Sequence, residues 1–230
     1  MPTRALIVID VQESFRSRPS WELISNPDIV HDVNRLVRHA RAEGDLVVWV
    51  LHAEPGSGGA FDPASGLVRY QDGLVAPLRG EPELRKTSHN AFTTTNLQQL
   101  LTERGVREVV ICGIRTEQCC ETTARLAADH GYRVTFVIDA TATQPIPHRS
   151  LLGSPGEGAD GSADAGRTED ADEEPPLNRV LGDPRTLSAE AVLERVEYAL
   201  AGRFARIATV DEVVAAGRPA VADRPEREVG

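Results

Sequence analysis

Residues 107–131 read REVVICGIRTEQCCETTARLAADHG and place an apolar run directly before a helical pattern. The β-branched run at 107–114 is typical of a buried strand, and Gly131 is placed to end the helix. Further strand-like runs lie at 5–10, 46–52, 133–141 and, more weakly, 206–210, and helical patterns lie between them. This alternation predicts an α/β fold with a layered, parallel sheet and right-handed crossovers.

The remaining helical patterns carry signals for where each helix starts. At 26–44, Asn26 is a candidate cap and Pro27 suits the first helical position. At 95–105, Thr95 and Gln98 have the spacing of a capping box. At 188–202, Ser188 is a candidate cap. These signals predict three helices besides the one that follows residue 114.

Length and charge restrict what the protein binds. The 230 residues, 40% of them hydrophobic, suffice for one domain over 1–230 with a substantial core. The formal net charge of −10 argues against nucleic acids and anionic membranes as partners, so we expect a small-molecule substrate. No stretch approaches the roughly 20 apolar residues of a membrane span. With only three cysteines, we expect a soluble protein in the reducing cytoplasm.

One segment departs from the alternating pattern. Residues 153–174 hold eight acidic residues against one basic and nothing apolar larger than alanine. Such a composition buries too little apolar surface to offset the entropy of ordering. We therefore expect a flexible acidic insertion in the single domain, extending over 153–185, and most simply a solvated loop without function.

Polar side chains gather where the strands end. Asp10, His52 and Asp139 stand at or near three strand ends, and Cys119 and Cys120 follow a fourth. Open α/β sheets bind ligands at this edge. The positive end of a helix dipole favours a thiolate, and free N–H groups there can receive an oxyanion. Adjacent helical residues point about 100° apart, so only one of the two thiols can face a substrate.

Three blocks carry a family resemblance: LIVIDVQESF at 6–15, RKTSHNAFTTTNLQQLL at 85–101 and VVICGIRTEQCCETTARLAADHGYRVTFVIDAT at 109–141. Together they resemble the isochorismatase-like cysteine hydrolases, which include nicotinamidase and N-carbamoylsarcosine amidohydrolase. The resemblance implies a three-layer sandwich with a mostly parallel six-stranded sheet flanked by helices. It also implies a homodimer or homotetramer.

The resemblance assigns catalytic roles to Asp10, Lys86 and Cys119. Asp10 would accept the thiol proton, Cys119 would attack an amide-type carbonyl to form a thioester, and Lys86 would orient Asp10 and stabilise negative charge. The family has a cis peptide before the nucleophile, which matches Ile114–Arg115. This bond would aim the Arg115 and Cys119 N–H groups at the oxyanion.

The resemblance also concerns substrate and cofactors. Gln12 and Phe15 match a family motif whose aromatic ring lies against the substrate, and the resemblance implies that both residues bind the substrate. Nicotinamidases hold a metal with an Asp-x-His and further histidines, whereas His52 here stands without them and is expected to be packed or hydrogen-bonded. We therefore expect no metal, no other cofactor and a substrate other than nicotinamide. Arg115 would either bind a substrate carboxylate or point away.

Three other activities stay open at this point. An isochorismatase-type enol-ether or ester hydrolase is one, although members with that activity lack the cysteine. A thiol redox switch on Cys119 and Cys120 is disfavoured because vicinal cysteines close only a strained ring. A non-catalytic binding subunit is disfavoured because Asp10, Lys86 and Cys119 are all present.

Overall fold

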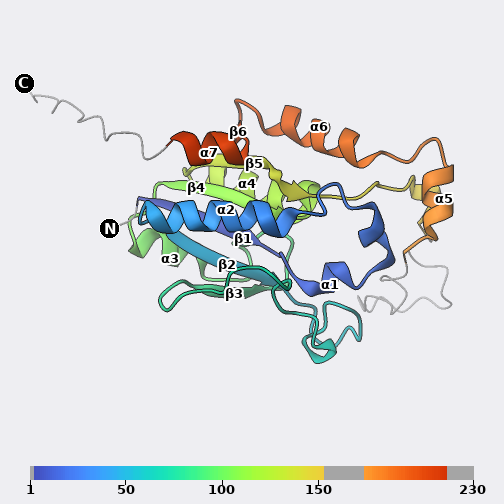
Figure 1. Cartoon of the computed structure of the whole chain (residues 1–230), viewed down its shortest axis with the longest axis horizontal. Helices are drawn as coiled ribbons and strands as arrows, with labels where there is room; N and C mark the ends of the chain where they lie inside the picture. The colour runs from blue at the N-terminus through green and yellow to red at the C-terminus, as the bar shows by residue number, and fades with distance from the viewer. Residues whose placement is uncertain (1–2, 153–173, 217–230) are drawn as a thin grey trace, which may run out of the picture.

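A six-stranded parallel sheet organises the chain in a computed structural model that describes residues 3–152 and 174–216 (Figure 1). Its order is β3-β2-β1-β4-β5-β6, and every neighbouring pair is parallel. The bounds are Arg4–Ile9 for β1, Leu46–His52 for β2, Glu83–Lys86 for β3, Glu108–Ile114 for β4, Arg133–Ala142 for β5 and Arg206–Ala208 for β6. The parallel α/β sheet and five of its strands are confirmed close to where their apolar runs predict them.

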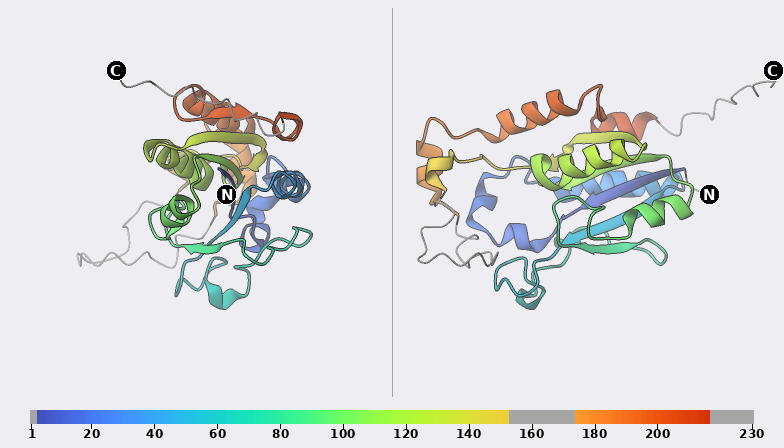
Figure 2. Two further views of the ribbon diagram at one scale, coloured as in Figure 1. Left: turned by 90° about the vertical axis from the view of Figure 1, so that its left-hand side faces the viewer. Right: turned by 180° about the vertical axis from the view of Figure 1, so that it is seen from behind.

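Helices cover both faces of the sheet and bury two apolar clusters. On one face, Leu6 and Val8 of β1 belong to one apolar cluster with residues of α2 (Ile29–Ala42) and α7 (Val210–Ala216). On the other face, Ile7 and Ile9 pack with α3 (Leu97–Glu103), α4 (Glu121–Asp129) and α6 (Ala189–Leu200). Figure 2 shows α2 on one side of the sheet and α3 and α4 on the other. This three-layer arrangement agrees with the fold that the resemblance implies.

Two of the three helix starts differ from their sequence signals. Helix α2 begins at Ile29, and the side chain of Asn26, two residues before the cap position Asp28, accepts from the N–H of Asp28. Helix α3 begins at Leu97; the Thr95 hydroxyl accepts from the Leu97 N–H and donates to a loop carbonyl, so no capping box forms. In both cases the polar side chain stabilises the turn before the helix instead. Ser188 caps α6 as predicted.

Gly113 lets β4 pass close to β1 beside the carboxyl edge of the sheet. Its φ is +130°, and a Cβ placed on it would lie 1.9 Å from the carbonyl oxygen of Ile9. No side chain is compatible with that distance, so only glycine fits here. The chain then leaves β1 through Asp10, whose φ of +53° is unusual for a residue with a side chain. These two positions fix how the functional side chains emerge.

The predicted insertion at 153–185 is described only in part. Residues 153–173 lie outside the described residues. From Glu174 onward the chain is folded, because α5 (Leu177–Gly182) buries Val180. Further short elements are the helix α1 (Glu13–Arg16) and 3-10 turns at Pro19–Leu23, Pro63–Ser65 and Arg149–Leu151. No helix within 3–152 or 174–216 has the length and apolar character that crossing a bilayer requires.

Candidate active site

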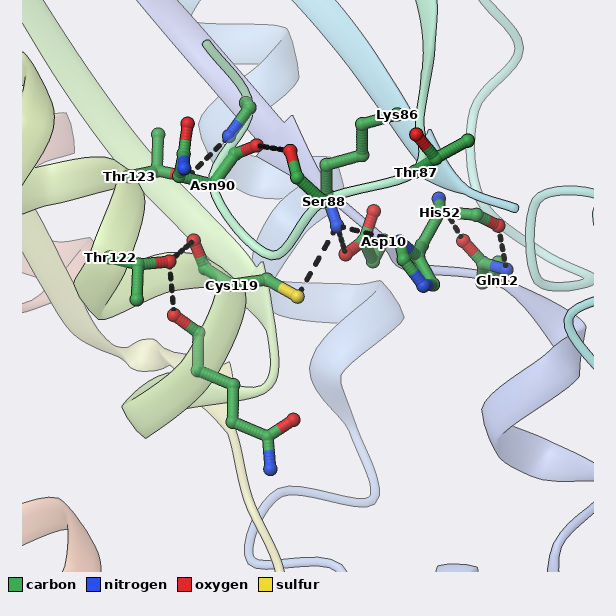
Figure 3. Close-up of polar contacts among 12 residues, drawn as sticks. Asp10, Gln12, His52, Lys86, Thr87, Ser88, Asn90, Cys119, Thr122 and Thr123 are labelled. Atoms are coloured by element: carbon green, nitrogen blue, oxygen red, sulfur yellow. Dashed lines mark hydrogen bonds and ion pairs between the residues drawn. The ribbon is translucent and has the colours of Figure 1, made fainter. Parts of the chain in front are cut away.

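Three elements bring Asp10, Lys86 and Cys119 together (Figure 3). Asp10 follows β1, Lys86 is the last residue of β3, and Cys119 lies in a π-helical turn, Thr116–Cys120, which leads into α4. Carboxyl ends of neighbouring parallel strands share one edge, which explains why residues so far apart in sequence meet. The structure therefore joins all three residues to which the resemblance gives catalytic roles.

Lys86 bridges the carboxylate and the thiol. Its Nζ lies 2.7 Å from Asp10 Oδ2 and 3.3 Å from Cys119 Sγ, and the Lys86 and Asp10 side chains are fully buried. Oδ1 of Asp10 has no hydrogen-bond partner among the described residues. That oxygen has lone pairs free to accept a proton.

The charges in this site set the state of the thiol. Burial acts to lower the pKa of Lys86, but Asp10 and Cys119 outweigh it and raise that pKa, so the ammonium stays charged. Burial and then Asp10 raise the pKa of Cys119 to about 12, against the opposing pull of Lys86. The helix start on its own therefore does not make Cys119 a resting thiolate. The thiol is protonated at neutral pH and must lose its proton when it reacts.

His52 extends the polar chain on the far side of Lys86. Its Nδ1 is 3.3 Å from Lys86 Nζ, and its Nε2 is 3.0 Å from Glu54 Oε1. Because an ammonium can only donate, His52 Nδ1 accepts a hydrogen bond from Lys86. Nε2 therefore carries the ring proton and donates a hydrogen bond to Glu54. The sequence predicted a packed or hydrogen-bonded histidine, but its contact with Lys86 depends on how β2 and β3 pair and could not be read from spacing.

Gln12 lies behind the site instead of in the pocket. Its Nε2 donates to Ser14 Oγ at 2.9 Å and to the His52 carbonyl at 3.0 Å, while its Oε1 accepts from the His52 N–H at 2.8 Å. The side chain is fully buried. Gln12 is not among the residues that line the pocket, and it clamps the end of β2 and so positions His52. Its expected substrate contact stays a prediction.

A pocket of about 290 Å³ opens beside Cys119. Phe15 lines it as expected and packs edge-on against Phe61, with ring centroids 4.9 Å apart. The guanidinium of Arg115 also lines it and lies 5.8 Å from the Phe15 ring centroid. Further lining residues that sequence reasoning did not identify include Arg18, Ser20, His89, Gln118, Gln144 and Glu174.

The turn that carries Cys119 has the predicted backbone feature. The Ile114–Arg115 peptide bond is cis. Cys120 and Cys112 are fully buried, and Cys120 packs in the cluster under α4. All three cysteines are free thiols. Of the two adjacent thiols, only that of Cys119 lines the pocket.

The donors around the pocket do not assemble a metal site. Both ring nitrogens of His52 are engaged by Lys86 and Glu54. Among residues 3–152 and 174–216, no group of three or more His, Cys, Asp or Glu side chains is placed to hold an ion. That the protein works without a metal remains a prediction.

Known proteins with similar sequences and structures belong to the isochorismatase family or are hydrolases. The isochorismatase domain model matches residues 4–150. Streptothricin hydrolase of Streptomyces noursei is 39% identical over 148 residues, which cover 64% of this chain and 57% of that protein. Nicotinamidase 3 of Arabidopsis thaliana is 50% identical over 151 residues, covering 60% of this chain and 73% of that protein. The crystal structure of an isochorismatase from Pseudomonas putida KT2440 superposes with a TM-score of 0.70 at 27% identity, covering 91% and 89% of the two chains.

The fold and the site together define the class of protein: a parallel α/β sheet whose carboxyl edge carries a thiol, a carboxylate and an ammonium beside a pocket. The chain belongs to the isochorismatase family. It spans little more than half the length of streptothricin hydrolase.

Proposed function

We propose that the chain is a cysteine hydrolase that cleaves a C–N amide-type bond of a small molecule through a thioester on Cys119. The observation that carries the proposal is the position of Lys86 Nζ, 2.7 Å from Asp10 Oδ2 and 3.3 Å from Cys119 Sγ. The relatives add support, because a hydrolase and a nicotinamidase are among them.

The first half-reaction begins with proton transfer. Asp10 takes the proton of Cys119 through its unpartnered Oδ1, and the sulfur attacks the carbonyl carbon of the substrate. The Lys86 ammonium offsets the negative charge that passes from Asp10 to sulfur and on to the carbonyl oxygen. The C–N bond then breaks, and the leaving nitrogen takes the proton back from Asp10.

The second half-reaction returns the thiol. Asp10 accepts a proton from water, and the hydroxide adds to the thioester carbon. The C–S bond breaks, the acid leaves, and Cys119 recovers its proton from Asp10. In both halves of the reaction the oxyanion would accept hydrogen bonds from the backbone N–H groups of Arg115 and Cys119.

The raised pKa of Cys119 fits this sequence of steps. A permanently ionised thiolate beside Asp10 would place two negative charges against the single positive charge of Lys86. Transfer of the proton only at the moment of attack keeps the buried site near neutrality throughout. The proposal therefore needs Asp10 as a base and Lys86 as a fixed cation, not an activated resting thiolate.

A release assay for ammonia or amine over small amides, ureido acids and carbamoyl compounds tests the proposal. Cys119→Ala should abolish turnover, and Cys120→Ala, a matched loss of a thiol one residue away, should retain it. Both variants are first checked for folding by circular dichroism. Turnover that survives Cys119→Ala would contradict the proposal, and hydrolysis of esters or enol ethers with no amide turned over would replace it.

A further inference from the structure

The carboxylate of Glu174 is held inside the pocket by donors from two other segments. Its Oε1 lies 2.9 Å from Arg18 Nε, 2.5 Å from Ser20 Oγ and 3.6 Å from Arg115 Nη2. Its Oε2 accepts from the backbone N–H of Ser20 at 3.0 Å. Two guanidiniums, a hydroxyl and an amide thus converge on one carboxylate, which is how proteins recognise a carboxylate ligand.

This cluster of Arg18, Ser20 and Arg115 requires an anion. The two arginine side chains are only 19% and 17% exposed, and Glu174 is 15% exposed. Burial and the charge of Arg18 act to lower the pKa of Arg115, while Glu117 and Glu174 act to raise it. One carboxylate oxygen of Glu117 already accepts a hydrogen bond from the Thr143 hydroxyl at 2.5 Å. Without Glu174, the like charges of Arg18 and Arg115 would share a poorly solvated wall of the pocket, with Glu117 as the remaining counter-charge to Arg115.

The same pocket holds the nucleophile and an unused donor. Cys119, Arg18, Ser20, Arg115 and Glu174 all line it. Gln144 also lines it, is 3% exposed, and its Nε2 has no hydrogen-bond partner among the described residues. A buried amide donor aimed at no acceptor indicates a polar ligand at this site.

We propose that Arg18, Ser20 and Arg115 form a carboxylate subsite, which Glu174 fills in this structure and which a carboxylate of the substrate takes in exchange. This inference rests on the proposed function, because it assumes that the pocket beside Cys119 receives the substrate. It names the substrate class as amide or ureido compounds that carry a carboxylate. Glu174 then acts as a specificity residue that weakens binding of any anion unable to displace it.

Alkylation of Cys119 tests the subsite without relying on turnover. Iodoacetate and iodoacetamide react alike with a thiol, which displaces iodide, but only iodoacetate is anionic. Mass spectrometry of digested protein gives the rate at Cys119 for each reagent. Glu174→Gln removes one negative charge at almost constant shape, so the iodoacetate-to-iodoacetamide rate ratio should rise about tenfold. Arg18→Gln should lower the same ratio about tenfold.

The matched control is Glu22→Gln, which removes the same charge from an exposed residue of the 3-10 turn that carries Ser20. Its ratio should equal that of wild type. A Glu174→Gln ratio within twofold of wild type, or equal to that of Glu22→Gln, overturns the subsite. The turnover panel tests the hydrolase proposal separately. If wild type turns over no compound of the panel while the alkylation ratios change as expected, the hydrolase reaction is contradicted and the anion subsite is retained.

A paired substrate measurement then tests the exchange. Succinamate and butyramide differ by the presence of a carboxylate. Glu174→Gln should lower the KM for succinamate about tenfold and leave the KM for butyramide within twofold. Equal changes in both KM values would overturn the exchange, because Glu174 would then shape the pocket without competing for the anion.

Discussion

Replacing Lys86 by methionine removes the one cation, among the residues that the structure describes, that lies within ion-pair distance of the Asp10 carboxylate. The cost of this change can be worked from burial. Both side chains are fully buried, at an Nζ–Oδ2 distance of 2.7 Å. Removal of one partner of a buried pair leaves an uncompensated charge and costs about 3–5 kcal/mol of unfolding free energy. For a chain of this size that corresponds to a fall of about 10 °C in Tm.

The assay is urea denaturation of wild type, Lys86→Met, Asp10→Asn and the double variant at pH 7.5. The double variant has no charge to leave unpaired, so it should lose at least about 2 kcal/mol less than the sum of the two single changes. Arg69→Met, which breaks the exposed Arg69–Asp72 pair, is the control and should leave the midpoint unchanged. A loss below about 1 kcal/mol for Lys86→Met, or additive single changes, would refute the reasoning.

Three further predictions concern the backbone, the thiol and the second layer of the site. Gly113→Ala should cost about 3 kcal/mol or more in urea denaturation, because the new Cβ meets the Ile9 carbonyl at 1.9 Å. Gly105→Ala, at a left-handed φ of +68° with open space around it, should cost only about 1 kcal/mol. The pKa of Cys119 is raised to about 12 in the folded state from an ordinary 9.0, so its contribution to stability is complete below pH 9 and is lost as the pH rises towards 12. Stability should therefore fall less steeply above pH 9 in Cys119→Ala than in wild type, and parallel curves would count against the shift. His52→Leu removes the hydrogen-bond acceptor for Lys86 and should lower kcat about tenfold with little change in KM. His52→Gln retains an acceptor and should recover part of the loss. A change confined to KM would show a substrate contact instead.

The sequence predicted the parts of the fold that depend on apolar pattern. The runs at 5–10, 46–52 and 133–141 became β1, β2 and β5 because strands buried on both faces need continuous apolar side chains. The strand β3 was not found, because ELRK at the sheet edge has one partly exposed and two exposed side chains before Lys86 and no β-branched residue. Only the family resemblance implied a sixth strand.

The site could be predicted to the extent that it rests on motifs. Asp10, Lys86 and Cys119 were found by resemblance and do meet in the structure. Gln12 was assigned to the substrate because a motif gives a position but not a direction, and its amide turns to the backbone of His52. Glu174 was assigned to a flexible insertion on composition, which cannot reveal that Arg18 and Arg115 lie opposite it.

The most direct test of the central claim is the mass of the protein while it is exposed to substrate. Wild type is mixed with a substrate from the amide panel, quenched in acid, and digested for mass spectrometry. The account predicts an acyl adduct on Cys119, removable by hydroxylamine as a thioester is, and none on Cys120 or Cys112. Substrate turnover with no adduct on Cys119, together with undiminished turnover by Cys119→Ala, would contradict it.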